Sequence, residues 1–310
     1  MAKAKSKAAA RQRRLRVHRG VRYAVQIAFF VAFPAVFSAS FNGVKYAFTQ
    51  IGLMQPVKLS SFVVLLLGVL AFTVMFGRFF CGYACAFGTL GDVLYALFAP
   101  VRKKLKLDAS KMPAKARRVL QSMKYLVLVV VCTLCFTGVW SQVSGLSPWT
   151  AFAGIVGGNI EGIAIGAFVA LGAVCIGMML VERFFCQFLC PLGAVFSLMP
   201  VLPLSAFRRD ADCCLKGCSL CERTCPVAIS PDPDAAVAGE CISCGRCADG
   251  CPIGNIAQIR IANGGEADSS DLRAYKKMSA SRFLLKIKGS EIPTVLVKAA
   301  ILFALCWLIM

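Results

Sequence analysis

The sequence predicts an α-helical integral membrane protein with four to five transmembrane helices, an internal repeat and a small α+β domain rich in cysteine. Three observations support this prediction. The 310 residues are 58% hydrophobic with a mean hydropathy of +0.71, which is too apolar for a soluble domain. A motif with two cysteines occurs twice at a fixed offset. Eight further cysteines gather between residues 214 and 251.

The amino-terminal segment predicts which side of the membrane carries the charge. Residues 1–22 are basic and contain no acidic residue, which is typical of a cytoplasmic tail. His18 lies in this tail and is expected to be solvated. The formal net charge of +20, from 35 Lys and Arg against 15 Asp and Glu, indicates cytoplasmic loops rather than nucleic-acid binding.

Five stretches with few charges are long enough to cross a bilayer. Lys124 lies near the start of the third stretch, where its side chain is able to snorkel to the surface. Lys298 interrupts the fifth, which therefore either spans the membrane or lies in its interface. The stretches cover residues 23–41, 59–77, 119–140, 162–181 and 292–310.

The charges between these stretches set the orientation. Residues 88–101 predict a short amphipathic or re-entrant piece, and the basic loop 102–118 follows it. With a cytoplasmic amino terminus, this loop and the cysteine-rich domain both face the cytoplasm of a multi-pass inner-membrane protein. The expected division is a basic tail, a helical membrane domain, a cysteine-rich domain, a linker with a basic surface segment, and a carboxy-terminal helix, over residues 1–22, 23–205, 206–262, 263–291 and 292–310.

The second half of the cysteine-rich region has the spacing of a bacterial iron–sulfur ligand loop. The run C-x2-C-x2-C-x3-C-P extends from Cys241 to Pro252. Three thiols wrap one face of an iron–sulfur cube, the fourth turns toward a neighbouring cube, and the proline prevents a helix from continuing through the loop. An earlier run ends in the same way, at Cys225 and Pro226. The two runs predict a ferredoxin domain with two [4Fe–4S] clusters; zinc, which also binds paired C-x2-C motifs, is disfavoured by the Cys-Pro endings and by the count of eight.

The first run departs from this spacing at its start, because Leu215 stands where a cysteine is expected. Cys213 and Cys214 are the nearest thiols, and Cys214 is the expected ligand, since Gly217 allows a tight kink that absorbs one extra residue. If ligands cross over in the usual way, each cluster takes the last cysteine of the other run. The predicted ligands are Cys214, Cys218, Cys221 and Cys251 for cluster one, and Cys241, Cys244, Cys247 and Cys225 for cluster two.

The membrane part contains the internal repeat. The segments R-F-F-C-G-Y-A-C at Arg78 and R-F-F-C-Q-F-L-C at Arg183 are offset by 186 − 81 = 105 residues, and each follows an apolar stretch. Two copies of a helix pair, related by an axis along the membrane normal, would bring their cysteines together. We hypothesise that these thiols bind a third redox or metal centre; thiol redox chemistry and simple core packing are the alternatives. The four are Cys81, Cys85, Cys186 and Cys190.

The sequence gives weaker indications for the two arginines of the repeat and for the other cysteines of the membrane part. Arg78 and Arg183 are interpreted either as snorkelling interface residues or as donors to a cluster sulfur or a quinone carbonyl. Core packing is expected for Cys132, Cys135, Cys175 and Cys306.

On these motifs the chain resembles the NapH/MauN-type membrane ferredoxins, which share their core with NosR-type and CcoG-type membrane polyferredoxins. The resemblance covers roughly residues 20–262. It departs from the family at Ala86, where the first C-x3-C motif lacks the proline that the family has, and at the extra residue in the first ferredoxin loop. It implies a membrane electron-transfer subunit that links a quinol or cytoplasmic donor to a partner oxidoreductase.

The sequence is compatible with two classes of function and disfavours others. The first is a non-catalytic electron-transfer component of an oxidoreductase complex, with membrane, quinone and partner subunits as its contacts. The second is a metal (cupric) reductase or an assembly factor for a metalloenzyme, as the CcoG-type relatives imply. A transporter with regulatory clusters is disfavoured by the few ionisable residues within the spans. One histidine cannot supply the two axial ligands of a bis-His haem.

Overall fold

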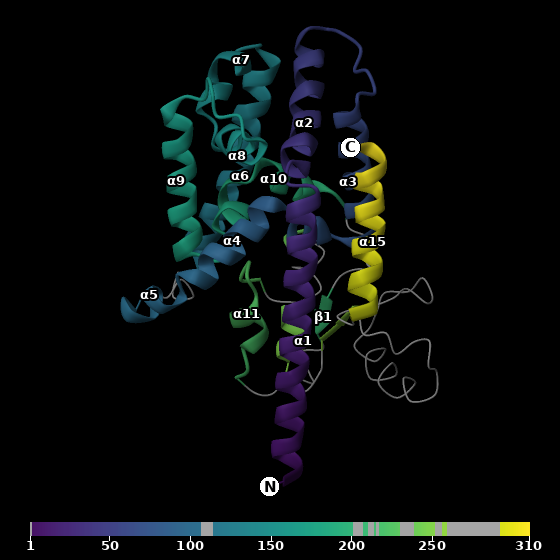
Figure 1. Ribbon diagram of the computed structural model, residues 1–310, viewed down its shortest axis with the longest axis vertical. Helices are drawn as coiled ribbons and strands as arrows, with labels where there is room; N and C mark the ends of the chain where they lie inside the picture. The colour runs from purple at the N-terminus through teal and green to yellow at the C-terminus, as the bar shows by residue number, and fades with distance from the viewer. Residues whose placement is uncertain are drawn as a thin grey trace.

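The computed structural model describes residues 2–106, 114–200, 207–209, 214, 217–229, 239–251, 256–258 and 292–310. Cys213, Leu215, Pro252 and the linker 263–291 lie outside the described residues. Helices dominate the rest, and a single long helix, α1 (Ala2–Ala32), runs through most of the molecule's length (Figure 1).

The chain bends where the first predicted span was expected to be continuous. α1 ends at Ala32, α2 (Val36–Gly52) begins after a short turn, and the two helices meet at 63°. Pro34 lies in the turn, where its ring and missing N–H prevent the helical hydrogen bonds from continuing. α2 then packs against α3 (Ser61–Phe76) and α6 (Ala114–Phe136).

Only some of the expected spans are long enough by themselves. Residues 116–136 of α6 and the carboxy-terminal α15 (Ile292–Ile309) are long and apolar enough to cross a membrane, and the bent α1–α2 pair would be a third span. α3 and α9 (Ile165–Leu180), predicted as the second and fourth spans, have 16 residues each. They fall short of the roughly 20 residues of a full crossing.

The repeat predicted from the sequence is present in the backbone. In each copy an apolar helix, α3 or α9, is followed by a π-helical turn that contains the first cysteine of the motif. These turns are η1 (Phe80–Ala84) and η4 (Phe185–Leu189). A new helix then begins directly after the second cysteine: α4 (Ala86–Leu97) or α10 (Pro191–Leu198). Single π-helical turns are rare and occur frequently at functional sites.

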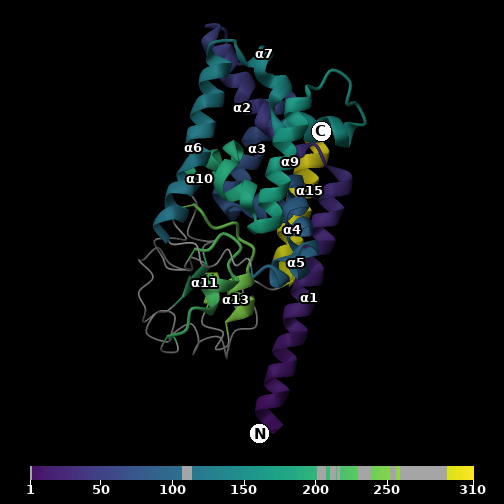
Figure 2. The ribbon, with the colours of Figure 1, turned by 90° about the vertical axis from the view of Figure 1, so that its left-hand side faces the viewer.

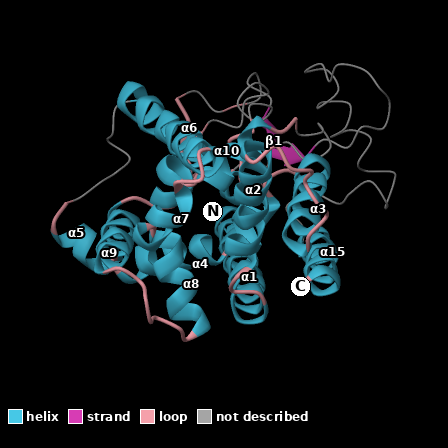
Figure 3. Cartoon of the chain, turned by 90° about the horizontal axis from the view of Figure 1, so that it is seen from above, coloured by secondary structure: helices cyan, strands magenta, loops and turns pink. Residues whose placement is uncertain are grey.

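Short helices connect the two copies. α5 (Ala99–Lys104) follows α4, while α7 (Trp140–Val143), η3 (Ser144–Leu146) and α8 (Pro148–Gly157) lead from α6 to α9. Seen from above, α3 and α15 lie together on one side of the bundle and α5 and α9 on the other (Figure 3).

The cysteine-rich module lies beneath the bundle and beside α1 (Figure 2). Its described elements are β1 (Phe207–Arg209), α11 (Leu220–Thr224), α13 (Arg246–Gly250) and β2 (Ile256–Gln258). The two strands pair antiparallel, with Phe207 opposite Gln258. Val227 and Ile242 of the module belong to the same buried hydrophobic cluster as the helices above, so the module is packed onto the bundle.

Candidate metal centre

The two C-x3-C motifs meet inside the helical domain. Their cysteines, called here the four-thiol group, are all buried, between 4% and 6% exposed. Burial and the proximity of the other three thiols raise the pKa of Cys190 well above that of free cysteine. Burial and the nearby Cys186 and Cys81 also raise the pKa of Cys85. The structure therefore brings together the group that the repeat predicts: Cys81, Cys85, Cys186 and Cys190.

The second cysteine of each motif occupies a helix amino terminus. Cys85 precedes the first residue of α4, and Cys190 precedes the first residue of α10. The Cys190 sulfur accepts a hydrogen bond of 3.1 Å from the backbone N–H of Gly193, and Gly88 donates in the same way to Cys85. Backbone donors at a helix amino terminus favour the thiolate form that binds metals, so these positions suit ligation.

Each of the two arginines of the repeat contacts the other copy of the repeat. Arg183, from the second copy, lies against Gly88 of the first, where an added Cβ would come within 2.3 Å of its Nη1. Arg78, from the first copy, lies against Gly193 of the second, at 3.0 Å from such a Cβ. Both arginines are at most 2% exposed, so the snorkelling interpretation is wrong. The donor interpretation fits Arg78, whose guanidinium lies close to the thiols of Cys81 and Cys190.

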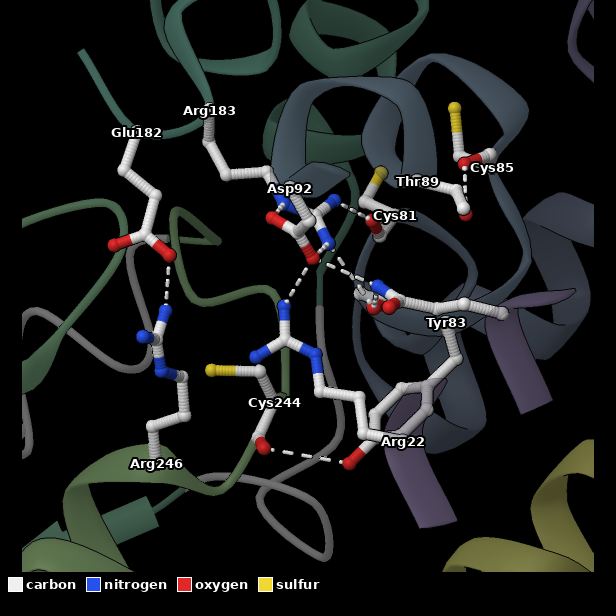
Figure 4. A network of polar contacts seen from close by, with 12 residues as sticks. Arg22, Cys81, Tyr83, Cys85, Thr89, Asp92, Glu182, Arg183, Cys244 and Arg246 are labelled. Carbon is white, nitrogen blue, oxygen red and sulfur yellow. Dashed lines mark hydrogen bonds and ion pairs between the residues drawn. The ribbon is translucent and has the colours of Figure 1, made fainter. Parts of the chain in front are cut away.

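Arg183 is held by a buried network (Figure 4). Its Nε donates to Asp92 Oδ1 at 2.7 Å and its Nη2 to Oδ2 at 2.6 Å. Arg22 and Gln26 of α1 also donate to Oδ2, at 2.7 and 2.8 Å. Arg183 further donates to the carbonyl oxygen of Cys81, which fixes the first motif against the second.

These contacts set the protonation of Asp92, which lies in α4 outside the candidate spans. Burial alone would raise the pKa of this carboxyl, but Arg183 and Arg22 outweigh burial and lower it to about 2. Sequence reasoning missed Asp92. The signal was its isolation, since it is the single charged residue between Arg78 and Arg102.

A second network surrounds Arg78. Its Nη1 donates to the Gly239 carbonyl oxygen at 3.1 Å and to Glu240 at 3.3 Å. Lys124 lies 2.5 Å from both oxygens of the same carboxylate, and the Tyr125 hydroxyl donates to it at 3.2 Å. Lys124 does not snorkel, because it is 0% exposed and paired with Glu240, which sequence reasoning also missed.

Each copy of the repeat contacts a different run of the cysteine-rich module. At Gly82, the residue after the first cysteine, an added Cβ would lie 2.5 Å from the Ile242 carbonyl oxygen of the second run. Next to it, the Tyr83 hydroxyl donates to the Cys244 carbonyl oxygen at 3.3 Å. Gln187, the equivalent of Gly82 in the other copy, donates to the carbonyl oxygen of Pro226 in the first run at 2.8 Å.

Four thiols of the module lie near one another across the two runs. Burial and the proximity of Cys244, Cys241 and Cys225 raise the pKa of Cys247 well above its ordinary value. Burial and the nearby Cys244 raise the pKa of Cys225 to about 11 and that of Cys241 to about 12. At neutral pH such thiols are protonated, so metal binding must release their protons.

The backbone around these thiols supplies hydrogen bonds to sulfur. The N–H groups of Val227, Ala228 and Ile229 donate to Cys225, and that of Ser243 donates to Cys241. Ala228 and Ser243 have φ angles of 49° and 51°, in the left-handed region where successive N–H groups form a concave nest. Such donors stabilise the charge of an iron–sulfur centre, so this donor set fits a [4Fe–4S] cluster.

Two of the thiols predicted for cluster one belong to a small hydrophobic core within the module. Cys221 is buried with Phe207 and Ile256, and Cys251 packs against this small core. Within the described ranges, no three His, Cys, Asp or Glu side chains converge closely enough to hold a single metal ion. A cube differs from a single ion, because each of its four irons takes its own thiolate.

His18 departs from its expected solvated state. Its Nδ1 lies 3.1 Å from Asp249 of α13, and its side chain is 13% exposed. The pair borders a cavity of about 270 Å³ that is also lined by Tyr83, Cys244 and Lys298. The amino-terminal helix therefore forms one wall of a space beside the cysteine-rich module.

The chain matches known proteins in the region of the repeat. A family described as "4Fe-4S binding domain" matches residues 60–107 and 163–208, which contain the four-thiol group. The chain is 30% identical to the uncharacterized protein MJ0749 of Methanocaldococcus jannaschii over 61% of its own length. It is 29% identical to the regulatory protein NosR of Pseudomonas aeruginosa over 56% of its length, and 25% identical to the ferredoxin-type protein NapH of Escherichia coli over 61%.

The matched regions cover 66% of MJ0749, 65% of NapH and 24% of NosR, less than two thirds of each relative. No solved structure matches the chain.

Proposed function

Because the chain belongs to the family of NapH- and NosR-type membrane ferredoxins, we propose that it relays electrons between a quinol or cytoplasmic donor and a partner oxidoreductase across the membrane. The observation that carries this proposal is the arrangement of thiols. The four-thiol group and Cys225, Cys241, Cys244 and Cys247 lie on either side of one contact between the bundle and the cysteine-rich module.

Two [4Fe–4S] clusters are the proposed cofactors of the module. Cluster two is assigned to Cys225, Cys241, Cys244 and Cys247, which the mutual pKa effects and the backbone donors support. Cluster one is assigned to Cys214, Cys218, Cys221 and Cys251. When bound, each cluster supplies one-electron transfer. The protein's own part is to hold the thiolates, donate hydrogen bonds to sulfur and keep water away.

A third iron–sulfur centre, rather than a single metal ion, is assigned to the four-thiol group. The family match at both copies of the motif supports this assignment, as do the two helix amino termini that face Cys85 and Cys190. Arg78 lies near Cys81 and Cys190, while Arg183 lies near Cys186 and Cys85. Two buried guanidinium groups offset the negative charge that four thiolates bring into an apolar interior.

The proposed architecture has four to five spans with the module on the cytoplasmic side. α6 and α15 cross the membrane, the α1–α2 pair forms a bent span, and α3 and α9 are short spans within a locally thinned bilayer. The basic residues of the tail 1–22 and the loop 102–118 support this orientation. The ferredoxin domain covers residues 206–262.

The cavity beside Cys244 is the proposed place for a quinol headgroup. Its walls include Phe79, Tyr83 and Tyr95, which suit a flat ring. An apolar groove between α1 and α15, lined by residues such as Phe29, Phe303 and Trp307, begins at Val25 and Leu296, next to residues of both helices that line the cavity. A headgroup with a long apolar tail would therefore be in contact with protein along its length.

The direct test is reduction of the purified protein under anaerobic conditions, followed by optical spectroscopy. A soluble quinol analogue or a low-potential donor is expected to bleach the cluster absorption. If neither donor reduces any cluster, but the protein still catalyses the reduction of Cu(II) by these donors, the cupric reductase alternative replaces this proposal.

The third centre has its own test. Replacing Cys81 and Cys186 together by serine is expected to lower the iron and acid-labile sulfide content per chain while the module's clusters remain. A double variant that retains the full wild-type iron content would remove the third iron centre from the proposal.

A further inference from the structure

From the repeated arginine onward, through the motif and the helix that follows it, the two halves of the repeat differ at one position that carries charge. With the offset of 105 residues, Arg78 corresponds to Arg183, Gly88 to Gly193 and Asp92 to Ser197. In the first half, Asp92 of α4 neutralises the arginine that crosses over from the second copy. In the second half, α10 contains no acidic residue, so it offers no carboxylate to Arg78.

The carboxylate that faces Arg78 comes from the cysteine-rich module. Glu240 lies 3.3 Å from Arg78 and 2.5 Å from Lys124. Tyr125 joins it to Ser197, since the tyrosine hydroxyl lies 2.9 Å from the serine hydroxyl and 3.2 Å from the carboxylate. Glu240 therefore stands beside the position that Asp92 occupies in the first half.

The backbone next to Glu240 approaches α10 closely, in a conformation that favours glycine. Gly239 has a φ of +73°, a conformation that residues with a side chain rarely adopt. An added Cβ would lie 2.6 Å from the Ser197 carbonyl oxygen, so the chain approaches α10 as closely as a glycine allows. The Gly239 carbonyl oxygen also accepts a hydrogen bond from Arg78.

We propose that Glu240 is the positioning residue that seats the cysteine-rich module on the second half of the repeat, in the role that Asp92 has in the first half. The module supplies the missing carboxylate, and in return it is held by two buried cations. Removing a carboxylate from a buried pair is costly because it leaves the cations without a counter-charge.

The contact of Glu240 with Arg78 and Lys124 also affects electron transfer. This consequence rests on the proposed function. Cys241 follows Glu240 directly, and Arg78 donates to Glu240 and to the Gly239 carbonyl oxygen at one end and lies against Gly193, next to the Cys190 sulfur, at the other. One guanidinium thus stands between the four-thiol group and cluster two. Glu240 fixes the separation of these two groups of sulfurs.

Hydrogen–deuterium exchange of the full-length, cluster-loaded protein tests this inference. Glu240→Gln is expected to raise the exchange rate of the amides at 239–247 at least about tenfold, since a hydrogen bond to a charged group contributes enough for such a factor. Glu240→Asp, which keeps the charge on a shorter side chain, is expected to give a smaller rise. Glu222→Gln, on an exposed face of α11, is the matched control and is expected to leave the rate unchanged.

A second variant tests the correspondence with Asp92. Ser197→Asp places a carboxylate on α10, where it competes with Glu240 for Arg78 and Lys124. It is expected to raise exchange at 239–247 and to shift the reduction potential of cluster two. When Ser197→Asp is combined with Glu240→Gln, thermal stability is expected to recover relative to Glu240→Gln alone, while exchange stays high.

The outcomes separate this inference from the proposed function. Wild-type protein that binds no iron would end the proposed function, whatever the exchange data show. Iron-loaded Glu240→Gln and Ser197→Asp variants with wild-type exchange at 239–247 and an unchanged potential would overturn the role of Glu240 alone. If Glu240→Gln does not fold, Glu240→Asp and Ser197→Asp carry the same comparison.

Discussion

Arg183 and Asp92 lie on different copies of the repeat and form a buried, two-pronged ion pair, with the two nitrogens 2.7 and 2.6 Å from the two carboxylate oxygens. Arg183 also holds the backbone of the first motif through the carbonyl oxygens of Cys81 and Gly82. The pair therefore fixes the two halves of the four-thiol group against each other.

The first prediction concerns the strength of this pair. Asp92→Asn leaves two buried guanidinium groups without their shared counter-charge, which is expected to cost about 3–5 kcal/mol of unfolding free energy. Thermal or denaturant unfolding in detergent measures the change. Glu161→Gln, at an exposed position in the loop before α9, is the control, and an Asp92→Asn variant as stable as this control would contradict the prediction.

The second prediction concerns pH. The folded-state pKa of Asp92 is lowered to about 2, below the roughly 3.9 of an unfolded aspartate. The carboxylate therefore contributes stability that is fully present above about pH 4 and is lost as the pH falls toward 2. The difference in melting temperature between wild type and Asp92→Asn is expected to be constant from pH 5 to pH 7 and to shrink below about pH 4. A difference that grows as the pH falls would have the wrong sign.

The third prediction concerns the contact between the first motif and the module. Gly82→Ala places a Cβ 2.5 Å from the Ile242 carbonyl oxygen, so the second cysteine run must move. Overpacking of this kind costs about 1–3 kcal/mol. Hydrogen exchange at 241–247 is expected to rise, whereas Gly172→Ala, which meets nothing within 4 Å, leaves it unchanged. Equal exchange in the two variants would refute the contact.

The fourth prediction separates the two clusters. Cys225→Ser is expected to remove or alter cluster two, because its thiol lies with those of Cys241, Cys244 and Cys247. Cys251→Ser is expected to affect cluster one instead. Iron content and EPR spectra of the reduced variants distinguish them, with Cys175→Ser in α9 as a control that keeps every cluster. Identical EPR changes in the first two variants would disprove the crossed ligand sets.

The sequence predicted some parts of this site because they repeat or keep a fixed spacing. The twin C-x3-C motifs indicated that two helix pairs meet, and the structure brings their thiols together. The bend at Pro34 could not be predicted from hydropathy, because an uncharged stretch is predicted as one span whether or not the helix is straight.

The buried ion pairs could not be predicted from the sequence alone, since each joins residues far apart in the chain. Lys124 and Glu240 are separated by 116 positions, and Asp92 and Arg183 by 91. A lysine near the end of an apolar helix can either snorkel or find a carboxylate. Only the packed module shows which occurs, because it brings Glu240 to the lysine.

The most direct test of the account is low-temperature EPR of anaerobically purified wild-type protein before and after reduction with dithionite, together with iron and acid-labile sulfide content. The account predicts a brown sample whose reduced form gives the signals of at least two interacting [4Fe–4S] clusters. A colourless sample without iron and without any signal after dithionite would contradict it.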